Sequence, residues 1–364
     1  MPTVDELRRI ALDAGLDALG VAPASPFEPT RRVLEQRKDA GLHGGMQFTY
    51  RNPARSTDPG RVLDGARSLV VGALGYRRAD PPGQRNAGAV ARYARADHYA
   101  TLRAALSRVA DGLVADGHRA RVVADDNALV DREAAHRAGI GWFGKNANLL
   151  LPGRGSWFVL GGVVTSAPLP ATGERERVPD GCGTCRRCLD GCPTGAIIAP
   201  GLVDARRCLA WLLQVDGPIP REYRSAIGDR LYGCDDCQEV CPPNKRADAA
   251  VPPVDAEDDA VAEVAVLDLL DVDDATILAR HGAWYIPKRD PDYVRRNALV
   301  VLGNSGDADD PRVTRTLERY LEHPSPMLRE HEAWAARRLG RDDLVAPRTG
   351  DPAVAAELAH PSPA

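Results

Sequence analysis

Eight cysteines lie within one stretch of the sequence, from Cys182 to Cys241, and none lies outside it. The two runs read Cys182-x2-Cys185-x2-Cys188-x3-Cys192-Pro193 and Cys234-x2-Cys237-x3-Cys241-Pro242, with Cys208 between them. Both runs end on a cysteine followed by proline, after the same x2 and x3 spacing. Thiols grouped in this way must meet around a shared inorganic group or pair as disulfides. This requirement constrains the fold more than any other feature of the chain.

The spacing is that of bacterial proteins with two [4Fe–4S] clusters, in which the cysteine before proline binds the other cluster. On this pattern the first cluster has four ligands: Cys182, Cys185, Cys188 and Cys241. The second has Cys192, Cys234 and Cys237, and Cys208 is the remaining cysteine that can complete it. Two full sets of thiolates result, and a crossed pair of neighbouring clusters suits electron transfer.

Zinc and disulfides are the alternative uses of grouped cysteines. Zinc sites use Cys-x2-Cys pairs but not a run of Cys-x2-Cys-x2-Cys-x3-Cys-Pro. Disulfides are typical of secreted chains, whereas Asp5–Ala14 has the charge pattern of a short amphipathic helix and not of a signal peptide. No run approaches the ~18 apolar residues of a membrane span. We therefore expect iron–sulfur clusters in a cytoplasmic protein with no membrane partner.

A chain of 364 residues should form two or three domains. We predict an α/β (α+β) domain over residues 1–175, a ferredoxin-like domain with two [4Fe–4S] clusters over 176–250, an all-α module over 260–345 and a tail over 346–364. The formal net charge of −4 argues against general nucleic-acid binding. Any nucleic-acid contact must therefore come from a local basic patch.

Strands and helices alternate in the first half of the chain, which indicates an α/β domain. We expect helices over residues 3–14, 30–40 and 99–116, and strands over 17–21, 68–74, 121–124 and 157–165. The passage from Gly41 to Gly65 is polar and rich in glycine, and loops of that length are commonly functional or disordered.

Gly139-Ile-Gly141-Trp-Phe-Gly144-Lys145 matches a dinucleotide fingerprint and nearly matches a P-loop. Both motifs need a strand before the glycines and a helix after them. The order here is reversed, because residues 132–138 are helical in pattern and 148–151 are strand-like. Asn146 also stands where a P-loop needs Ser or Thr. We interpret these glycines as a tight turn or as a close approach to a large flat ligand.

The last third of the chain is helical in pattern. We expect helices over residues 292–302, 312–323 and 327–339, preceded by a linker over 245–259. The helix stops at Gly303 and Gly340 are 37 residues apart, a spacing that resembles HEAT-type helical pairs. The Pro- and Ala-rich residues after about Arg341 predict a frayed tail.

Two longer motifs carry a family resemblance. Val123-Ala-Asp125-Asp-Asn-Ala-Leu-Val-Asp131-Arg132 and Ile227-Gly-Asp-Arg230-Leu-Tyr-Gly-Cys234-Asp235-Asp236-Cys237 resemble epoxyqueuosine reductases, as does the Gly139–Asn146 stretch. The resemblance covers about residues 5–340. It implies a cobalamin-dependent iron–sulfur oxidoreductase that performs the last step of queuosine biosynthesis. Such an enzyme removes the epoxide oxygen of epoxyqueuosine at the anticodon wobble position of tRNA, with cob(II)alamin reduced to cob(I)alamin by electrons from the clusters.

The resemblance also implies residue roles. Asp125 aligns with the family's proton donor, although an aspartate after a strand can also be a simple turn residue. The implied cobalamin contacts are Arg55, Ala91, Asp125, Leu149, Leu160, Asp235 and Asp236. The stretch Asp97-His98-Tyr99 departs from the family's Asp-Tyr-His order, so side-chain roles are not carried over there. A purely structural role for these residues is the alternative to cofactor contact.

Basic and aromatic residues gather between Arg280 and Arg296, where Trp284 and Tyr285 lie among five basic side chains. Such a mixture can bind phosphate and stack on bases; a solvated helix face is the alternative. With the implied tRNA substrate, we predict that tRNA binds Lys288, Arg289, Arg295 and Arg296.

Two other functions fit parts of the sequence. A reductive dehalogenase also combines cobalamin with iron–sulfur clusters, but usually has a twin-arginine export signal and lacks the helical pair. An electron carrier fused to a helical binding module leaves the α/β half unexplained. The sequence does not name the low-potential electron donor or the axial ligand of cobalt. We expect a monomer.

Overall fold

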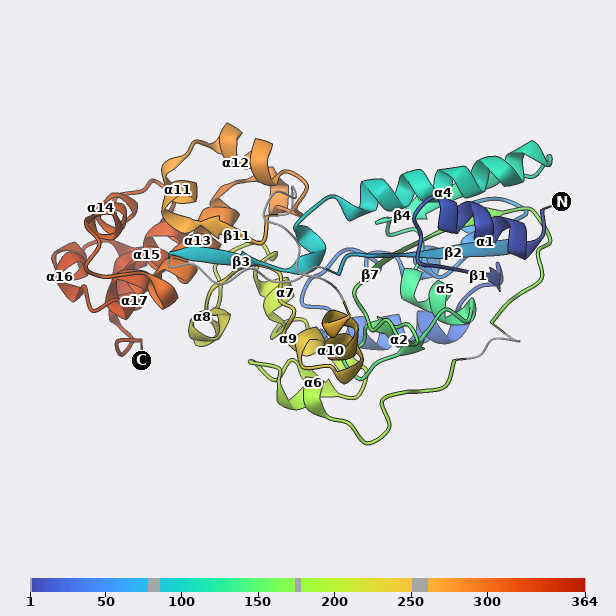
Figure 1. Ribbon diagram of the computed structural model, residues 1–364. Helices are drawn as coiled ribbons and strands as arrows, with labels where there is room; N and C mark the ends of the chain where they lie inside the picture. Colours follow the sequence, from blue (N-terminus) through green and yellow to red (C-terminus); the bar gives the residue numbers. More distant parts are fainter. Residues whose placement is uncertain (1, 78–85, 174–177, 251–260, 364) are drawn as a thin grey trace. The chain divides into compact units, whose positions relative to one another are not determined.

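The computed structural model describes residues 2–77, 86–173, 178–250 and 261–363 (Figure 1). The chain forms two compact units, each assembled from segments that are distant in sequence. Unit 1 comprises Met1–Ala79, Asp97–Arg206 and Asp236–Ala256. Unit 2 comprises Asp80–Ala96, Arg207–Asp235 and Glu257–Ala364.

Unit 1 is built on a four-stranded antiparallel sheet. Its order is β1 (Ala18–Pro23), β2 (Ser68–Gly75), β7 (Phe158–Thr165) and β4 (Ala120–Ala124), and every neighbouring pair is antiparallel. These are the four strands predicted from the sequence, and their existence is confirmed. The antiparallel pairing makes the unit an α+β fold.

Helices cover both faces of this sheet, with α1 (Val4–Asp13) and α4 (His98–Ala115) on one side and α5 (Asp131–Arg137) on the other (Figure 1). Gly72 and Gly161 are direct partners across β2 and β7. A Cβ at Gly161 would lie 2.9 Å from a methyl of Leu106, and one at Gly72 would lie 2.8 Å from a methyl of Leu16. The two glycines therefore let α4 approach the centre of the sheet closely.

The other face of the sheet packs against α5. Leu69, Val71 and Ala73 of β2 are buried with Leu160 and Val164 of β7. Small side chains complete this core: Ala134 and Ala135 of α5 and Ala138 at its C-cap. This packing fixes the end of β4 and the turn that leads from it into α5.

Capping residues define the ends of the helices. Thr3 and Glu6 form a capping box at the start of α1, and Asp97 accepts a hydrogen bond from the Ala100 amide (2.9 Å) at the start of α4. The predicted helix over residues 30–40 is α2 (Glu28–Asp39). The glycine-rich passage from Gly41 to Gly65 contains only α3 (Pro53–Ser56) and the 3-10 turn η1 (Pro59–Arg61).

Short elements complete unit 1. They are the hairpins β5 (Trp142–Phe143) with β6 (Leu149–Leu150) and β8 (Ile197–Ala199) with β9 (Leu202–Val203), and the helices α6 (Arg187–Asp190), α9 (Asp236–Glu239) and α10 (Pro242–Ala249). The predicted linker over 245–259 is corrected at its start, because residues 245–249 are the end of α10. Residues 251–260 lie outside the described part of the chain.

Unit 2 contains a three-stranded sheet that sequence periodicity did not predict. Strand β3 (Ala87–Val90) lies in the middle, parallel to β10 (Arg230–Tyr232) and antiparallel to β11 (Glu263–Ala265). Each strand has only three or four residues, too few for a period of two to stand out. The turn η2 (Arg92–Ala94) and the helices α7 (Leu209–Leu212) and α8 (Arg221–Ile227) flank this sheet in the chain.

The helical module of unit 2 confirms the three helices predicted there. They are α13 (Asp292–Ser305), α14 (Pro311–Tyr320) and α15 (Pro326–Arg338), preceded by α11 (Val266–Asp271), α12 (Asp274–His281) and the turn η3 (Pro287–Arg289). Gly303 of α13 faces Trp334 and Ala335 of α15, and a Cβ there would lie 2.8 Å from each of them. Among all described residues, no helix is both long enough and apolar enough to cross a bilayer.

The C-terminal tail is ordered, which corrects the prediction that it is frayed. Its elements are α16 (Asp342–Val345), the turn η4 (Ala346–Arg348) and α17 (Pro352–Leu358). Glu357 of α17 is buried and pairs with Arg221 (3.0 Å) and Arg337 (3.3 Å). A buried ion pair with two partners holds the tail against α15 and α8, which a Pro- and Ala-rich composition does not reveal.

Glu332 on α15 is a buried carboxyl without a partner. Its side chain has no exposed surface, and neither carboxyl oxygen is hydrogen-bonded to any described residue. Burial raises the pKa of Glu332 well above its ordinary value of 4.5. The group therefore stays protonated in the fold while it ionises in the unfolded chain.

We expect Glu332→Met to raise the free energy of unfolding by about 1–3 kcal/mol at pH 7. Methionine is similar in shape to glutamate, and the substitution removes the buried carboxyl that has no hydrogen-bond partner among the described residues. The gain should grow as the pH rises above 4.5, the ordinary pKa of glutamate, because only the unfolded wild-type chain loses its proton there. It should stop growing once the pH exceeds the raised pKa of the folded state. Thermal unfolding across pH measures both effects. Glu318→Met on the exposed face of α14 is the control, and equal gains in both variants would contradict the assignment.

Candidate redox and catalytic site

The cysteines of the predicted clusters are all free thiols and half-buried. Unit 1 contains six of them: Cys182, Cys185, Cys188, Cys192, Cys237 and Cys241. Unit 2 contains Cys208 and Cys234. No three His, Cys, Asp or Glu side chains in the described ranges are close enough to hold a single metal ion. The four ligands of a [4Fe–4S] cluster can lie farther apart than the ligands of a single ion, since each binds a different iron atom.

Electrostatics shows that Cys241 lies near the first run although it is more than fifty residues away in sequence. Burial raises the pKa of Cys241 to about 11, and the charges of Cys182, Cys188 and Cys185 add to this increase. Burial also raises the pKa of Cys188, again with contributions from Cys182 and Cys185. Cys241 and Cys188 therefore lie close to Cys182 and Cys185, and the four thiols form a donor set that fits a positively charged iron group, because binding requires the thiolates.

Local backbone structure presents these thiols. The Cys185 amide donates to the Cys182 carbonyl (3.0 Å), which curls the first run into a turn before α6. Cys241 is the N-cap residue of α10, directly before Pro242. The Ala196 amide donates to the sulfur of Cys192 (3.2 Å). Hydrogen bonds of this kind to sulfur are among the factors that set the reduction potential of a cluster.

Asp125 lies at the end of β4 with a left-handed backbone conformation (φ 53°). The register Ala124↔Gly161 places it at the end of the ladder where Leu160 of β7 lies. The turn after it is fixed by Asp126, whose carboxylate accepts a hydrogen bond from the Ala128 amide (2.8 Å). A non-glycine residue with positive φ costs free energy, and such residues cluster at functional sites.

The electrostatic surroundings favour a protonated Asp125. The side chain reaches solvent, yet partial desolvation raises the pKa of its carboxyl, and the nearby Arg103 guanidinium opposes this effect. Burial also raises the pKa of Asp131 and of the Tyr99 hydroxyl, and the charge of Asp125 contributes to both. Asp125 therefore lies among groups that resist further negative charge, as a proton donor requires.

Arg55 belongs to a segment that is tied to the Asp125 turn. It lies in α3, and the carbonyl of the next residue, Ser56, accepts a hydrogen bond from the Val130 amide (2.9 Å). The Arg55 side chain is exposed and makes no ion pair with any described residue. A free guanidinium at this position is available for an amide or phosphate group of a ligand.

The other proposed cofactor contacts of unit 1 are mostly buried. Leu149 in β6 and Leu160 in β7 belong to the same apolar core. Asp236 is the first residue of α9, directly before Cys237. The structure thus places Arg55, Asp125, Leu149, Leu160 and Asp236 in unit 1, and it links the segments of Arg55, Asp125 and Leu160 directly.

Unit 2 brings the remaining two contacts together. The Arg92 amide donates to the carboxylate of Asp235 (2.7 Å), and the preceding Ala91 amide donates to the Tyr232 carbonyl (2.9 Å). Gly233, which follows Tyr232 in the chain, has φ 76°, and a Cβ there would lie 2.5 Å from the Cβ of Ala91. Only glycine fits, so the turn before Cys234 is held tightly against Ala91.

The four predicted tRNA-binding residues fall into two groups. Arg296 is fully buried, and its guanidinium donates to the carbonyls of Val215 and Leu212 (2.8 and 3.3 Å). Arg295 is 6% exposed and pairs with Asp274 (2.5 Å) and Asp292. Burial corrects the prediction for these two residues, because their guanidinium groups are used inside the fold and do not reach a phosphate.

Lys288 and Arg289 are exposed on the loop before α13. Both have positive φ (53° and 58°), an arrangement that costs free energy for two consecutive non-glycine residues. The loop is anchored by Trp284, which donates to the Ala94 carbonyl (2.9 Å) and stacks on Tyr232 with ring centroids 4.5 Å apart. The strained loop is therefore attached to the strand that leads to the second cysteine run.

Tyr285 on this loop was part of the sequence pattern but was not among the predicted contacts. Its ring is 58% exposed, while its amide is held by the Tyr232 hydroxyl (2.8 Å). A fixed backbone with an exposed aromatic ring beside two cations provides a surface on which a base can stack.

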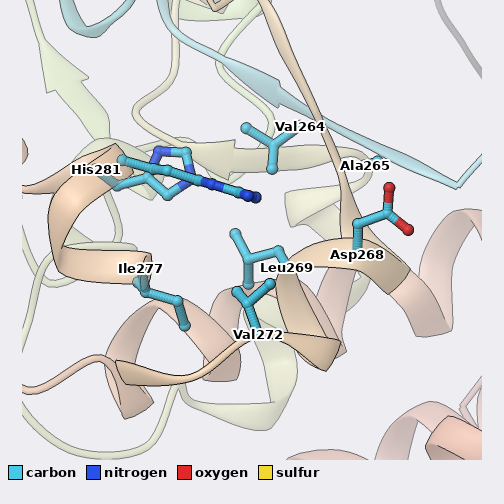
Figure 2. Close-up of a pocket in the computed structure, with 8 residues that line it drawn as sticks. Val264, Ala265, Asp268, Leu269, Val272, Ile277 and His281 are labelled. Carbon is cyan, nitrogen blue, oxygen red and sulfur yellow. The ribbon is translucent and has the colours of Figure 1, made fainter. Parts of the chain in front are cut away.

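A small pocket in unit 2 is lined by none of the predicted site residues. Figure 2 shows Ile277 and His281 of α12 facing Leu269 and Val272 at α11. The pocket volume is about 130 Å³. Ligand sites of ordinary size are several times larger, so the pocket suits a few water molecules and not a corrin.

Comparisons with known proteins agree with this geometry. Residues 181–244 match the family model described as a 4Fe-4S double cluster binding domain. The chain is 34% identical to the epoxyqueuosine reductase of Xanthomonas campestris pv. campestris, over 92% of this chain and 95% of the relative. It is 32% identical to that of Bacillus subtilis, over 97% of this chain and 89% of the relative.

Solved structures give the same result. A crystal structure of epoxyqueuosine reductase with an epoxyqueuosine-modified tRNA-Tyr stem loop superposes with a TM-score of 0.87 at 30% identity, covering 98% of this chain and 96% of that chain. The enzyme from Streptococcus thermophilus gives 0.85 at 27% identity, covering 98% and 97%.

We expect Cys241→Ser to lose one cluster and therefore about half of the bound iron, since it removes one of four thiolate ligands. The double variant Cys188→Ser/Cys241→Ser should lose no more iron than either single change. Cys208→Ser/Cys241→Ser should lose both clusters. Iron and sulfide analysis after anaerobic reconstitution measures these contents. Further loss in the first double variant would contradict the ligand sets.

Proposed function

We propose that this chain, which belongs to the epoxyqueuosine reductase family, reduces epoxyqueuosine to queuosine at the wobble position of a tRNA anticodon. The observation that carries the proposal is the similarity over nearly the whole chain, combined with a two-cluster domain and an exposed, protonatable Asp125 in the same fold. Because the substrate is tRNA, we place the reaction in the cytoplasm.

The reaction sets the chemical requirements. Converting an epoxide to an alkene consumes two electrons and two protons and releases the oxygen as water. Iron–sulfur clusters transfer single electrons, so a further centre must act on the C–O bond. A bound cobalamin would supply a strongly reducing cobalt for this purpose. The protein's own residues must orient the substrate, deliver a proton and connect the clusters to the site.

The residues that would hold a corrin have suitable chemistry. Arg55 is an exposed guanidinium that forms no ion pair with the residues the structure describes, as a partner for propionamide or phosphate groups requires. Leu149 and Leu160 are buried in the core of unit 1, so they would contact the ring through their backbone. Ala91 and Asp235 are held near each other in unit 2, because the amide of Arg92 donates to the Asp235 carboxylate. Asp236 directly precedes the cluster ligand Cys237. Contacts from residues beside cluster ligands would keep electron transfer short.

The iron–sulfur domain holds two clusters, and we assign their ligands as follows. Cys182, Cys185, Cys188 and Cys241 bind the first, and Cys192, Cys208, Cys234 and Cys237 bind the second. The assignment is supported by the spacing and by the raised pKa values of Cys241 and Cys188, to which the nearby Cys182 and Cys185 contribute.

Asp125 is the proposed proton donor. Its raised pKa increases the fraction that holds a proton at neutral pH, and it lies in a strained turn directly after β4. Transfer of that proton to the departing oxygen prevents a free alkoxide from forming, which is general acid catalysis. A Bacillus subtilis epoxyqueuosine reductase structure has its aspartate catalytic loop swung out of the active site, which supports a mobile role for such a loop.

Tyr285, Lys288 and Arg289 form the proposed tRNA contact. Cationic side chains bind the phosphates, and the exposed ring of Tyr285 stacks on a base. Lys288 pairs with Asp216 (2.7 Å), and because this ion pair is exposed and weak, a phosphate can replace the carboxylate. The local positive loop explains how a chain of net charge −4 can bind RNA. The solved relative with a bound tRNA stem loop supports an RNA substrate for this fold.

We expect Asp125→Asn to lower the single-turnover rate about 10²- to 10⁴-fold, the usual contribution of a general acid, with tRNA affinity unchanged. In the wild type the rate should fall as the pH rises through the pKa of Asp125, which lies above its ordinary value of 3.8, because the donor form is lost. Asp125→Glu should recover part of the rate. The exposed Asp111→Asn on α4 is the control, and a full rate in Asp125→Asn would refute the role.

Lys288→Gln and Arg289→Gln should each weaken tRNA binding, because each removes a cation that neutralises a phosphate. The slope of log affinity against log salt should fall by about 1 for each phosphate that is no longer neutralised. Arg315→Gln is the matched control, because it removes one exposed positive charge from α14, away from the proposed contact loop in the sequence. Binding is measured with a stem loop that carries epoxyqueuosine over a range of salt concentrations. An unchanged slope in the double variant would remove this loop from the interface.

The complete function is tested by anaerobic reconstitution. Iron, sulfide and cobalamin contents are measured, and epoxyqueuosine-containing tRNA is then supplied with a low-potential reductant. Formation of queuosine that depends on added cobalamin is the expected result. If the protein binds both clusters and forms queuosine without added cobalamin, the assignment of two clusters would stand and the proposed need for cobalamin would be refuted.

A further inference from the structure

The turn between β5 and β6 carries two polar side chains whose contacts the reductase reaction does not require. Lys145 and Asn146 lie at the tip of this hairpin, in the stretch whose glycines resemble a nucleotide-binding loop. Each side chain forms hydrogen bonds with a different run of the cysteine domain. All the residues involved belong to unit 1.

Lys145 binds the first cysteine run. Its ammonium donates to the carbonyl of Gly183 (2.6 Å) and to the carbonyl of Cys185 (2.8 Å). Its own carbonyl accepts a hydrogen bond from the Gly201 amide in the β8–β9 turn (2.9 Å). A half-buried positive charge is thereby fixed against the backbone that carries Cys185.

Asn146 binds the second cysteine run. It is 6% exposed, and its side-chain amide donates to the Cys237 carbonyl (3.3 Å). The Asn148 amide donates to the other end of the same side chain (3.2 Å), which fixes its orientation. Adjacent residues on one turn thus hold two cysteine runs that are about fifty residues apart.

The hairpin is rigid enough to position these groups. A Cβ at Gly144 would lie 2.3 Å from a methyl of Leu150 and 2.7 Å from the side-chain oxygen of Asn146, so a larger residue would force these side chains to move. Ala147 adopts a left-handed conformation (φ 64°), and the Gly144 amide donates to the Asn148 carbonyl (2.8 Å). The glycines serve a tight turn, whose tip reaches the cysteine domain and leaves no phosphate-binding role for Lys145.

We propose that Lys145 and Asn146 brace the two cysteine runs and that the Lys145 charge raises the reduction potential of the first cluster. A fixed positive charge near a cluster stabilises the reduced form, which is more negative by one electron. Lys145 is a positioning residue that acts through the loop of Cys182, Cys185 and Cys188. The inference rests on the cluster ligands proposed above.

The test is a redox titration of the reconstituted protein, in which the electron paramagnetic resonance signal of each reduced cluster is measured at each applied potential. Lys145→Gln should lower the potential of one cluster, reducing the ratio of reduced to oxidised cluster about tenfold at a fixed applied potential, or about 59 mV for one electron. The other cluster should change less. Lys145→Arg should restore the wild-type potential, since it keeps both the charge and the donors.

Controls separate this inference from the proposed function. Lys38→Gln removes an exposed charge from α2 and should move neither potential. Loss of one cluster in Lys145→Gln, with both retained in Lys145→Arg, would support the brace. Unchanged potentials and iron content in Lys145→Gln, or cluster loss in Lys145→Arg as well, would overturn it. Failure of the wild type to bind two clusters would instead refute the ligand assignment.

Discussion

The fold must bring Cys241 close to the first cysteine run if both are to bind one cluster. Crowded thiols resist ionisation, as the raised pKa values of Cys241 and Cys188 show, so the polypeptide itself must hold the runs together. A buried hydrogen-bond network does this. Asn244, which has no exposed surface, accepts from the Ser156 amide (2.6 Å) and donates to the Gln238 carbonyl (2.9 Å).

The Asn244 network connects the second cysteine run to the sheet of unit 1. Ser156 lies just before β7, and its hydroxyl donates to the side chain of Gln238 in α9 (2.8 Å). A Cβ at Gly155 would lie 2.0 Å from Asn244, so the backbone at this point fits the asparagine closely. Buried networks of this kind are costly when partly broken, which makes them strong determinants of one arrangement. The central sheet of unit 1 therefore positions the segment of Cys237 and Cys241 as well as Asp125.

The sequence predicts the parts of this structure whose physics is local. Periodicity identifies the four strands of unit 1 and the helices α4, α13 and α15, because each buries a continuous apolar face. The cysteine spacing predicts two clusters for a similar reason, since a few residues of backbone must wrap one inorganic core. The order of the strands could not be read this way, because strands that alternate with helices can pair in either direction.

Residues that depend on tertiary partners were beyond sequence reasoning. Arg296 and Lys288 are both basic and lie eight positions apart, yet one is buried among carbonyl groups and the other is exposed. Composition treats them alike, whereas the geometry of η3 and α13 separates them. The same limit applies to Glu357, whose ion pairs order a tail that composition marks as disordered.

Lys145 shows how a motif can mislead when its structural context is reversed. The glycines that resemble a nucleotide loop are required by a β-hairpin, and the lysine that would face a phosphate donates to backbone carbonyls of the cysteine loop. A hairpin tip with fixed donors provides a rigid contact to both cysteine runs. The turn at Asp125 and the β5–β6 hairpin both adjoin the face of the sheet that packs against α5, where Leu149 and Leu160 share one core. Close packing of that core therefore fixes the Asp125 turn and the hairpin tip together.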